Sequence, residues 1–204
     1  LGFGLLKKGF TASRQKTTKA PAHLRGGTIS FKGGMQTLID ALATYLSNHI
    51  EYRVDGRTLD ISHQETILCM PAHQAALMFP NHALKHLLQN VSYSPVISLT
   101  LFCKESDLTR FKPGFGCLIP RNEGYTVLGV LFNHCIFEGR VTTKGTASLT
   151  CIIRDFDGTL FQKTDAELLN IAKADLKRLL GLQGAPLGQV IHRWQQGIPL
   201  YSPA

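Results

Sequence analysis

The sequence predicts an α+β domain in which helices flank a mainly antiparallel or mixed sheet. Hydrophobic residues make up 44% of the 204 residues and charged residues 18%, the balance of a chain that buries a core. Residues 96–103 alternate between two faces, as a strand does. A capping box at Thr164 opens an amphipathic helix. Strands and helices in separate runs favour the α+β class.

Two elements are predicted near the start of the chain. Residues 28–31 predict a short strand, and the glycine pair at 33–34 then breaks the chain before a helix. The apolar residues of that helix recur at helical spacing and share one face: Leu38, Leu42, Tyr45 and Leu46. We therefore expect an amphipathic helix after the glycine pair.

Two further elements are predicted before residue 90. Residues 66–70 form a continuous apolar run that Pro71 ends, which is typical of a buried strand. Asn81 belongs to the residue types that cap helices and predicts a short helix through Leu88. His82 and His86 have the i, i+4 spacing of metal ligands, but no third ligand lies nearby in the sequence. We expect this histidine pair to be structural or exposed, and we predict no metal site.

The second half of the chain predicts most of the sheet. Strands at residues 126–132, 148–153 and 190–194 follow the alternating strand at 96–103. The helix that Thr164 opens is expected to end at Gly181. Its apolar stripe consists of Leu168, Ile171, Ala172, Leu176 and Leu179.

The net charge of +8 is concentrated at the start of the chain. Residues 1–39 hold seven Lys and Arg residues and no Asp or Glu. We expect a basic lead-in segment at residues 1–27, before a main domain at 28–204. Such a segment suits a solvated arm or peripheral contact with an anionic membrane, and its few aromatic residues argue against nucleic acid. The chain opens with Leu1 rather than Met, which predicts a fragment or a processed product.

The five cysteines are scattered, and no two form a CxxC pair. This pattern argues against a disulfide framework and against a zinc site. Most of the cysteines lie in apolar stretches, so we expect buried free thiols and a reducing, cytoplasmic setting. The longest apolar runs, such as residues 127–132, are far too short for a helix that spans a bilayer.

One short motif resembles the first motif of haloacid dehalogenase-like phosphatases: Asp155-Phe156-Asp157-Gly158-Thr159-Leu160. In that chemistry the first Asp attacks a phosphoryl group, the second is a general acid, and both hold Mg²⁺. Arg154 stands where that family usually has an apolar residue, and too few residues follow for a doubly wound core. We therefore interpret the motif as a polar turn and keep the phosphatase as an alternative.

Several segments together resemble the protoporphyrinogen oxidase branch of the FAD-dependent amine oxidase superfamily. Residues 31–38 are similar to its Gly-Gly-x-x-x-Leu stretch, and residues 67–73 to its apolar strand that ends in Pro-Ala. Residues 114–120 resemble its Gly-Phe-Gly hairpin. Residues 128–140 and 176–201 follow in the family's order, the latter ending in Ile198-Pro199-Leu200-Tyr201. The resemblance covers nearly the whole chain.

This resemblance implies the substrate-binding part of an FAD enzyme of haem biosynthesis that oxidises protoporphyrinogen IX to protoporphyrin IX. The cofactor performs the redox chemistry, and the protein offers an apolar slot for the flat macrocycle. The resemblance implies that the substrate-binding residues are Gly116, Leu118 and Ile152. It implies that the residues beside the FAD are Trp194, Ile198, Pro199, Tyr201, Met70 and Pro71.

The resemblance also implies what this chain lacks. No GxGxxG phosphate-binding turn occurs in the sequence. Arg154 and Asp155 replace the family's usual glycine pair, and His134 replaces a common Ser. We expect the chain alone to bind FAD weakly and to be inactive without the remaining FAD-binding portion of the enzyme. The enzyme is expected to be cytoplasmic, with peripheral contact to the inner membrane.

Other interpretations stay open at this point. A coproporphyrinogen oxidase or another flavin amine oxidase relative fits the same motifs, because the sequence does not show which propionates are recognised. A non-enzymatic binding module derived from this fold is a further alternative. Considered alone, Trp194 and Leu118 also fit a core, and Gly114 and Gly116 also fit a bulge or a tight turn.

Overall fold

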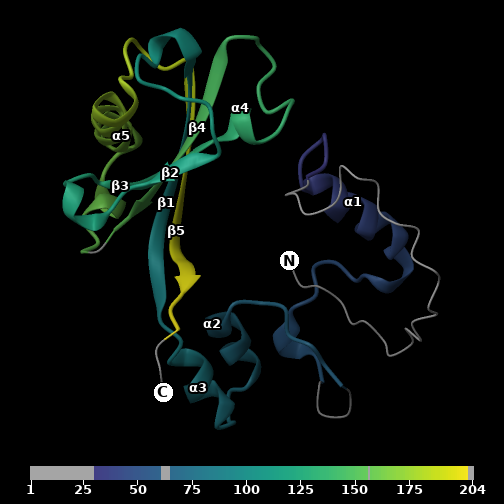
Figure 1. The fold of residues 1–204 in the computed structure, drawn as a ribbon. Coiled ribbons are helices and arrows are strands. Elements are labelled where there is room, and N and C mark those ends of the chain that lie inside the picture. The colour runs from purple at the N-terminus through teal and green to yellow at the C-terminus, as the bar shows by residue number, and fades with distance from the viewer. Residues whose placement is uncertain (1–29, 61–64, 156, 202–204) are drawn as a thin grey trace, which may run out of the picture. The chain divides into compact units, whose positions relative to one another are not determined.

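The computed structural model describes residues 30–60, 65–155 and 157–201 (Figure 1). The chain divides into two compact units, residues 1–91 and residues 92–204. The basic segment and its predicted boundary after residue 27 lie outside the described residues, so both stay predictions.

The first unit consists of short helices joined by turns. Its α-helices are α1 (Gln36–Tyr45), α2 (Ala72–Ala75) and α3 (Leu84–Gln89), and 3-10 turns lie at Ser47–His49, Gly56–Thr58 and Ala76–Met78. The predicted amphipathic helix is confirmed as α1, but none of its residues is buried. Among the described residues of this unit, the buried side chains are Ala75 and Ala76 alone.

Two strand predictions and one cap prediction for the first unit are wrong, whereas the predicted short helix through Leu88 is confirmed as α3. Ser30 and Phe31 are not in a strand, while residues 28 and 29 lie outside the described part. Residues 66–70 are not a strand either, because an apolar run does not by itself supply a neighbouring strand to pair with. Helix α3 begins three residues after Asn81, with Ala83 as its N-cap. The backbone N–H of Leu84 donates to Nδ1 of His82 (3.1 Å).

The second unit contains a five-stranded antiparallel sheet in the order β2-β3-β4-β1-β5, which confirms the predicted fold class. The strands are β1 (Tyr93–Lys104), β2 (Gly116–Leu118), β3 (Val127–Phe132), β4 (Thr146–Arg154) and β5 (Gly188–Pro199). The predicted strands match β1, β3 and β4 closely. The last strand is longer than the predicted 190–194, since it pairs with β1 along almost its whole length.

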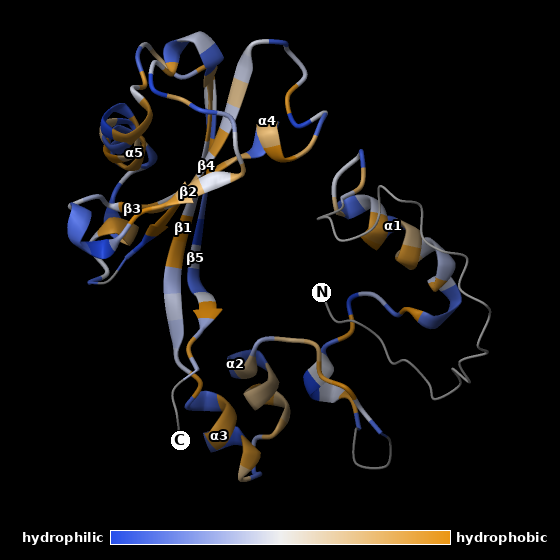
Figure 2. Ribbon diagram, in the orientation of Figure 1, coloured by the Kyte–Doolittle hydropathy of each residue, from blue (hydrophilic) through white to orange (hydrophobic). Residues whose placement is uncertain are grey.

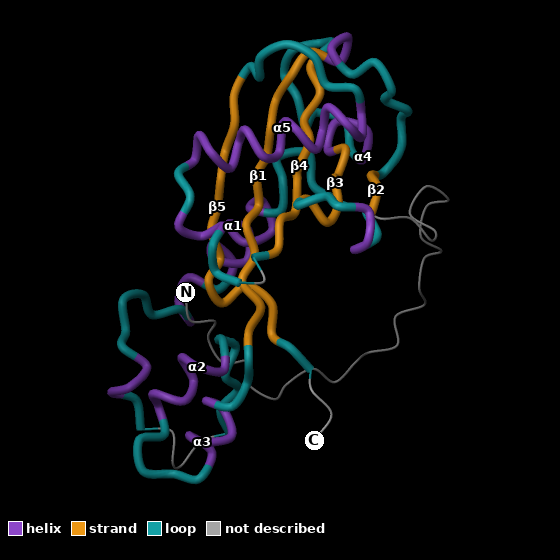
Figure 3. Tube along the Cα trace, turned by 90° about the vertical axis from the view of Figure 1, so that its left-hand side faces the viewer, coloured by secondary structure: helices purple, strands orange, loops and turns teal. Residues whose placement is uncertain are grey.

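Helix α5 (Asp165–Leu180) crosses the strands on one face of the sheet (Figure 3). Its capping box is confirmed, because Thr164 Oγ1 accepts from the Glu167 N–H while Glu167 Oε2 accepts from the Thr164 N–H. Gly181 ends the helix with a φ of +70°. A Cβ at this position would lie 2.2 Å from Thr109 Oγ1, so only glycine fits.

The core lies between α5 and the strands. Alternate strand residues point toward the helix, as the two-residue period of a strand requires. The core residues that are fully buried from solvent are Ile97, Leu99, Leu101, Cys103, Ala147, Leu149, Cys151, Ile153, Leu168, Ala172 and Leu176.

Two polar contacts fix α5 on the sheet. The buried Asp175 carboxylate accepts from the backbone N–H groups of Thr126 and Val127 (2.8 and 2.9 Å), where β3 begins. Arg193 of β5 forms an ion pair with Asp165 (2.6 Å) in the first turn of α5. On its one face of the sheet, the helix is therefore attached both to β3 and to the edge strand β5.

Candidate functional site

The sheet face away from α5 carries four of the residues that the sequence predicts for ligand contact. Residues that pair directly across antiparallel strands point to the same face. One such row consists of Leu118, Gly129, Ile152, Ser98 and His192, and the next of Gly116, Leu131, Thr150, Thr100 and Val190. A third row consists of Arg154, Val96 and Trp194. We call these three rows the open face.

The open face exposes large apolar side chains. Leu118 is 90% exposed and Trp194 56% exposed, whereas the helix-side residues Leu99, Cys151 and Ile153 of the central strands are fully buried. Ile152 is half-buried between them. Figure 2 shows the hydrophobic colouring along β1 and β3 and at the end of β5. A surface of this kind is typical of a place where an apolar ligand or another protein surface is bound.

The spacing of the strands sets the size of this surface. Leu118 in β2 and Ile152 in β4 lie two strands apart, which corresponds to about 9.5 Å. Trp194 lies in β5, two strands beyond Ile152 and one row along. The structure therefore places the predicted substrate residues and the predicted flavin residue Trp194 on one broad sheet face.

A hydrogen-bonded network crosses the open face, and sequence reasoning did not predict it. The hydroxyls of Thr100 and Thr150 bond to each other (2.8 Å). Asn133, the first residue of α4 (Asn133–Ile136), donates from Nδ2 to Thr150 Oγ1 (2.8 Å) and Ser148 Oγ (3.1 Å). The signal for it was the hydroxyl residues at alternate positions in both strands. This network gives the apolar surface a fixed polar centre.

His134 extends this network but leaves one nitrogen without a partner. Its Nδ1 lies 3.2 Å from the backbone oxygen of Ser148 and 3.3 Å from its nitrogen. Its Nε2 is buried and has no hydrogen-bond partner. The ring packs against Phe111, with ring centres 5.4 Å apart.

Gly116 has a structural reason to be glycine. Its φ is +155°, and a Cβ there would lie 2.3 Å from the backbone oxygen of Val130 in β3. Phe115, just before it, is 60% exposed, and its backbone oxygen accepts from the N–H of Phe132 (3.0 Å). The turn therefore brings β2 close to β3 and presents Leu118 outward, and any contact of Gly116 with substrate stays a prediction.

The residues predicted to contact the flavin fall in both units. A bulge in the β1–β5 pairing separates Trp194, opposite Val96, from Ile198, opposite Ser94. Pro199 pairs with Tyr93, and Tyr201 follows with 94% of its surface exposed. These residues give exposed ring and alkyl groups that fit contact with a flat ring system.

Met70 and Pro71 belong to the first unit. Met70 is half-buried, and the exposed Pro71 is the N-cap of α2. Their predicted position near the adenine of FAD is not tested by the structure. The flavin contacts of all these residues stay predictions, and the sequence holds no GxGxxG turn for the phosphates of FAD.

The phosphatase interpretation is wrong. Asp155 directly follows β4, but β4 belongs to an antiparallel sheet, so the doubly wound parallel core of that chemistry is not formed. The expectation of buried thiols is right for Cys103 and Cys151, while Cys117 is half-buried and Cys69 and Cys135 are exposed. Each thiol is free, and the described residues contain no group of three metal-ligating side chains.

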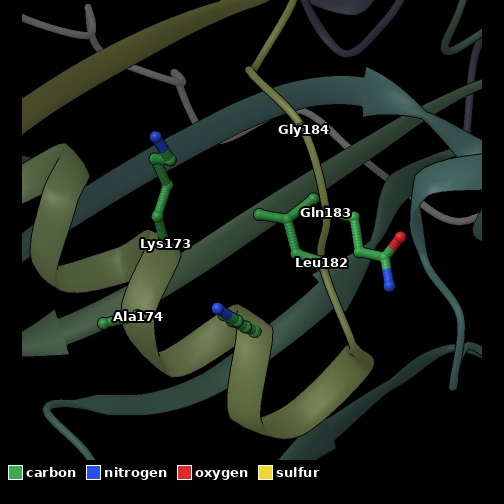
Figure 4. A pocket seen from close by; sticks show the side chains of 6 residues that line it. Lys173, Ala174, Leu182, Gln183 and Gly184 are labelled. Carbon is green, nitrogen blue, oxygen red and sulfur yellow. The ribbon is translucent and has the colours of Figure 1, made fainter.

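A cavity of about 490 Å³ lies away from the open face (Figure 4). It is formed by the outer surface of α5 and the chain that follows the helix, and its lining residues are Lys173, Ala174, Lys177, Leu182, Gln183 and Gly184. None of these residues belongs to the open face. The large cavity and the predicted site are therefore separate features.

The arrangement of strands and helices is shared with a solved crystal structure. A crystal structure from Exiguobacterium sp. 255-15 that carries a protoporphyrinogen oxidase name matches with a TM-score of 0.67 at 20% identity, over 85% of this chain and 41% of that one. This likeness establishes the fold. The family of flavin containing amine oxidoreductases matches residues 5–203, so the chain belongs to that family.

Curated relatives of this chain include protoporphyrinogen oxidases and a coproporphyrinogen oxidase. Protoporphyrinogen oxidase 2 of Arabidopsis thaliana is 30% identical over 237 residues, which cover 97% of this chain and 46% of that protein. The mitochondrial protoporphyrinogen oxidase of Nicotiana tabacum is 27% identical over 90% of this chain and 43% of its own length. Coproporphyrinogen III oxidase of Bacillus subtilis is 22% identical over 72% of this chain and 31% of its own length. The chain thus spans less than half the length of the curated relatives that it matches.

Across the described residues, no helix is both long enough and apolar enough to cross a bilayer.

Proposed function

We propose that this chain is the substrate-binding part of an FAD-dependent oxidase that converts protoporphyrinogen IX to protoporphyrin IX. The observation that carries the proposal is the open face, on which Leu118, Ile152 and Trp194 form one exposed, mostly apolar surface. The protoporphyrinogen oxidases among the relatives support it. A large apolar macrocycle and a broad sheet face with exposed apolar side chains are complementary in polarity.

In this proposal the residues of the open face bind and orient the substrate. Leu118 and Ile152 contact the macrocycle, which covers side chains that are otherwise in water and so adds a favourable hydrophobic contribution. The Asn133–Thr150–Thr100 network holds the centre of the surface rigid, because each hydroxyl already has a partner. FAD, when bound, accepts the electrons taken from the substrate.

Arg154 is the basic residue that fits a carboxylate of the substrate. It lies in the same row as Trp194, and its Nε donates to Ser94 Oγ (2.9 Å). This bond orients the guanidinium before a ligand arrives, and a preorganised guanidinium is well suited to a carboxylate. The propionates of a porphyrinogen are carboxylates of this kind.

Coproporphyrinogen is the second candidate substrate, because the Bacillus subtilis relative is named for it. It differs from protoporphyrinogen in carrying additional propionates. Comparing the affinities of the chain for the two oxidised porphyrins therefore separates the candidates.

An optical titration of the whole chain with protoporphyrin tests the proposal. We expect a shift of the porphyrin Soret band that is saturable, and a Leu118→Asp, Ile152→Asp double variant that no longer produces it. Leu77→Asp is the matched control, since Leu77 is an exposed apolar residue (55%) of the first unit. An unchanged Soret band, or equal binding by the double variant and the control, would contradict the proposal.

We also propose that the enzyme is cytoplasmic and touches the inner membrane from that side. The support is the basic character of residues 1–39 in the sequence. Co-sedimentation with vesicles that contain anionic lipid should occur at low salt and disappear at high salt, because exposed charges are screened. Vesicle binding that is independent of salt would contradict this part of the proposal.

A further inference from the structure

The open face carries a histidine, His192, for which the proposed function gives no role. His192 pairs with Ser98 across β5 and β1, and Ser98 pairs with Ile152 across β1 and β4. The three strands lie side by side (Figure 3), so these three side chains point to the same face. His192 is exposed, so a ligand on the open face can contact its imidazole.

The open face around His192 has basic groups and no acidic one. On β5 its neighbours on this face are Val190 and Trp194, and the centre of the imidazole lies 6.3 Å from the centre of the Trp194 ring. The three rows of the open face contain no Asp or Glu, and Arg154 of β4 is their one permanently charged side chain. None of the ion pairs found among the described residues includes His192. A surface with basic groups and no carboxylate favours an anionic ligand.

The charged residue that follows His192 in the chain, Arg193, lies on the helix side of the sheet. It alternates with His192 along β5 and pairs with the buried Ile97 of β1. Its guanidinium forms the ion pair with Asp165 of α5 (2.6 Å). On β1, the residue directly opposite His192 is the uncharged Ser98. A positive charge on the imidazole is therefore available to a ligand on the open face.

The spacing of His192 and Arg154 suits two carboxylates on one edge of a large ring. The two residues stand two strands and one row apart, which places their backbone positions about 12 Å from each other. Both side chains are long enough to shorten this distance from either end. The apolar body of the same ring then covers Ile152 and Leu118 toward β2.

We propose that His192, as the imidazolium, binds a second carboxylate of the substrate, next to the one assigned to Arg154. The hydroxyl of Ser98, opposite His192, is a further donor for this carboxylate. The inference rests on the proposed function and narrows the substrate class to apolar rings with a pair of carboxylates on one edge. Histidine as a residue type gains its charge between about pH 8 and pH 5, so binding strengthens as the pH falls through this range.

Soret titrations of the whole chain with protoporphyrin IX at about pH 6 and about pH 8 test the inference. The native chain should bind about two- to fivefold more tightly than His192→Gln at the lower pH, the usual gain from an exposed charge pair, and equally at the higher pH. Comparing the two chains at each pH removes any effect of pH on the porphyrin itself. His192→Lys stays charged at both pH values and should exceed His192→Gln by the same factor at both. Since His192 is exposed, each variant keeps the fold.

Two controls separate a carboxylate contact from a general effect of charge. Lys177→Gln removes one positive charge from an exposed position of α5, on the other side of the sheet, and should leave the affinity unchanged at both pH values. The dimethyl ester of protoporphyrin has no free carboxylate, so the native chain and His192→Gln should bind it equally. Equal binding of protoporphyrin IX by these two chains at both pH values, or an equal loss in Lys177→Gln, would overturn the inference and leave the proposed function in place. An unchanged Soret band in the native chain would contradict both.

Discussion

The two faces of the sheet in the second unit differ in what they do, although the same strands form both. On the helix side, Leu99, Leu149 and Ile153 are completely buried. On the open face, their neighbours along the chain are mostly hydroxyl residues such as Thr100 and Thr150, and the exposed Leu118 of β2 lies on the same face. Because successive residues of a strand point to opposite faces, one set of residues contributes to stability and the other set is exposed for binding. Changes on the helix side should lower stability, and changes on the open face should alter binding.

The largest expected effect is the loss of a core side chain on the helix side. Leu176 of α5 is 0% exposed. Leu176→Ala should lower the free energy of unfolding by about 2–5 kcal/mol, because it removes buried methyl groups and leaves a cavity. Urea denaturation followed by circular dichroism measures this change.

The matched control for this change is one residue further along the same helix. Lys177 is exposed, so Lys177→Ala should change the free energy of unfolding by less than about 0.5 kcal/mol. Similar losses in the two variants would show that α5 does not pack on the sheet as described.

Asp175→Asn should give the next largest effect. Its Oδ2 accepts two backbone N–H groups at the start of β3, and an amide oxygen without the negative charge is a weaker acceptor for both. We expect a loss of about 1–3 kcal/mol in the free energy of unfolding, because buried hydrogen bonds to a charged group become bonds to a neutral one. Glu138→Gln is the control, since Glu138 is an exposed carboxylate of the second unit, and a loss as large as that of Asp175→Asn would argue against the buried contact.

The helix side should also show a pH dependence at alkaline pH. Burial, followed by the nearby charges of Asp175 and Cys117, raises the pKa of Cys151 from 9.0 to about 12. The unfolded thiol ionises first, so stability is fully present below about pH 9 and decreases as the pH rises toward 12. Across this pH range, the free energy of unfolding should fall more steeply in the native chain than in Cys151→Ala. Equal slopes would contradict the assigned burial.

Alkylation at neutral pH provides an independent measurement of the same difference. Cys69 and Cys135 are exposed and should react with iodoacetamide in the folded chain. Cys103 and Cys151 are buried, and burial raises the pKa of both thiols, so they should react only after unfolding. Mass spectrometry of peptides identifies which thiols are modified.

Rules that involve only neighbouring residues explain which parts of the structure could be predicted from the sequence. The alternation at 96–103 and the capping box at Thr164 involve residues next to each other in the chain, and both are confirmed in the structure. The apolar run at 66–70 was predicted as a strand and is not one, because a strand also depends on a partner that local sequence does not specify.

The open face required information that local rules do not contain. Its rows join residues that are distant in the sequence, such as Leu118 with Gly129 and Gly129 with Ile152. The family resemblance indicated Gly116, Leu118, Ile152 and Trp194, and the strand register places all four on one surface. The Asn133–Thr150 bond was missed because it depends on how α4 lies over the sheet, which follows from the fold rather than from either segment.

The smallest expected effect on stability belongs to the most exposed residue of the open face. Leu118 is 90% exposed, so Leu118→Ser should change the free energy of unfolding by less than about 0.5 kcal/mol. The same variant should bind protoporphyrin more weakly, because the lost side chain is one that the macrocycle is proposed to cover. Leu176→Ala provides the opposite pattern, in which stability falls while the intact fold at low temperature still binds. If Leu118→Ser instead destabilised the chain as strongly as Leu176→Ala, both faces would contribute to one core, and the separation of stability from binding within each strand would be wrong.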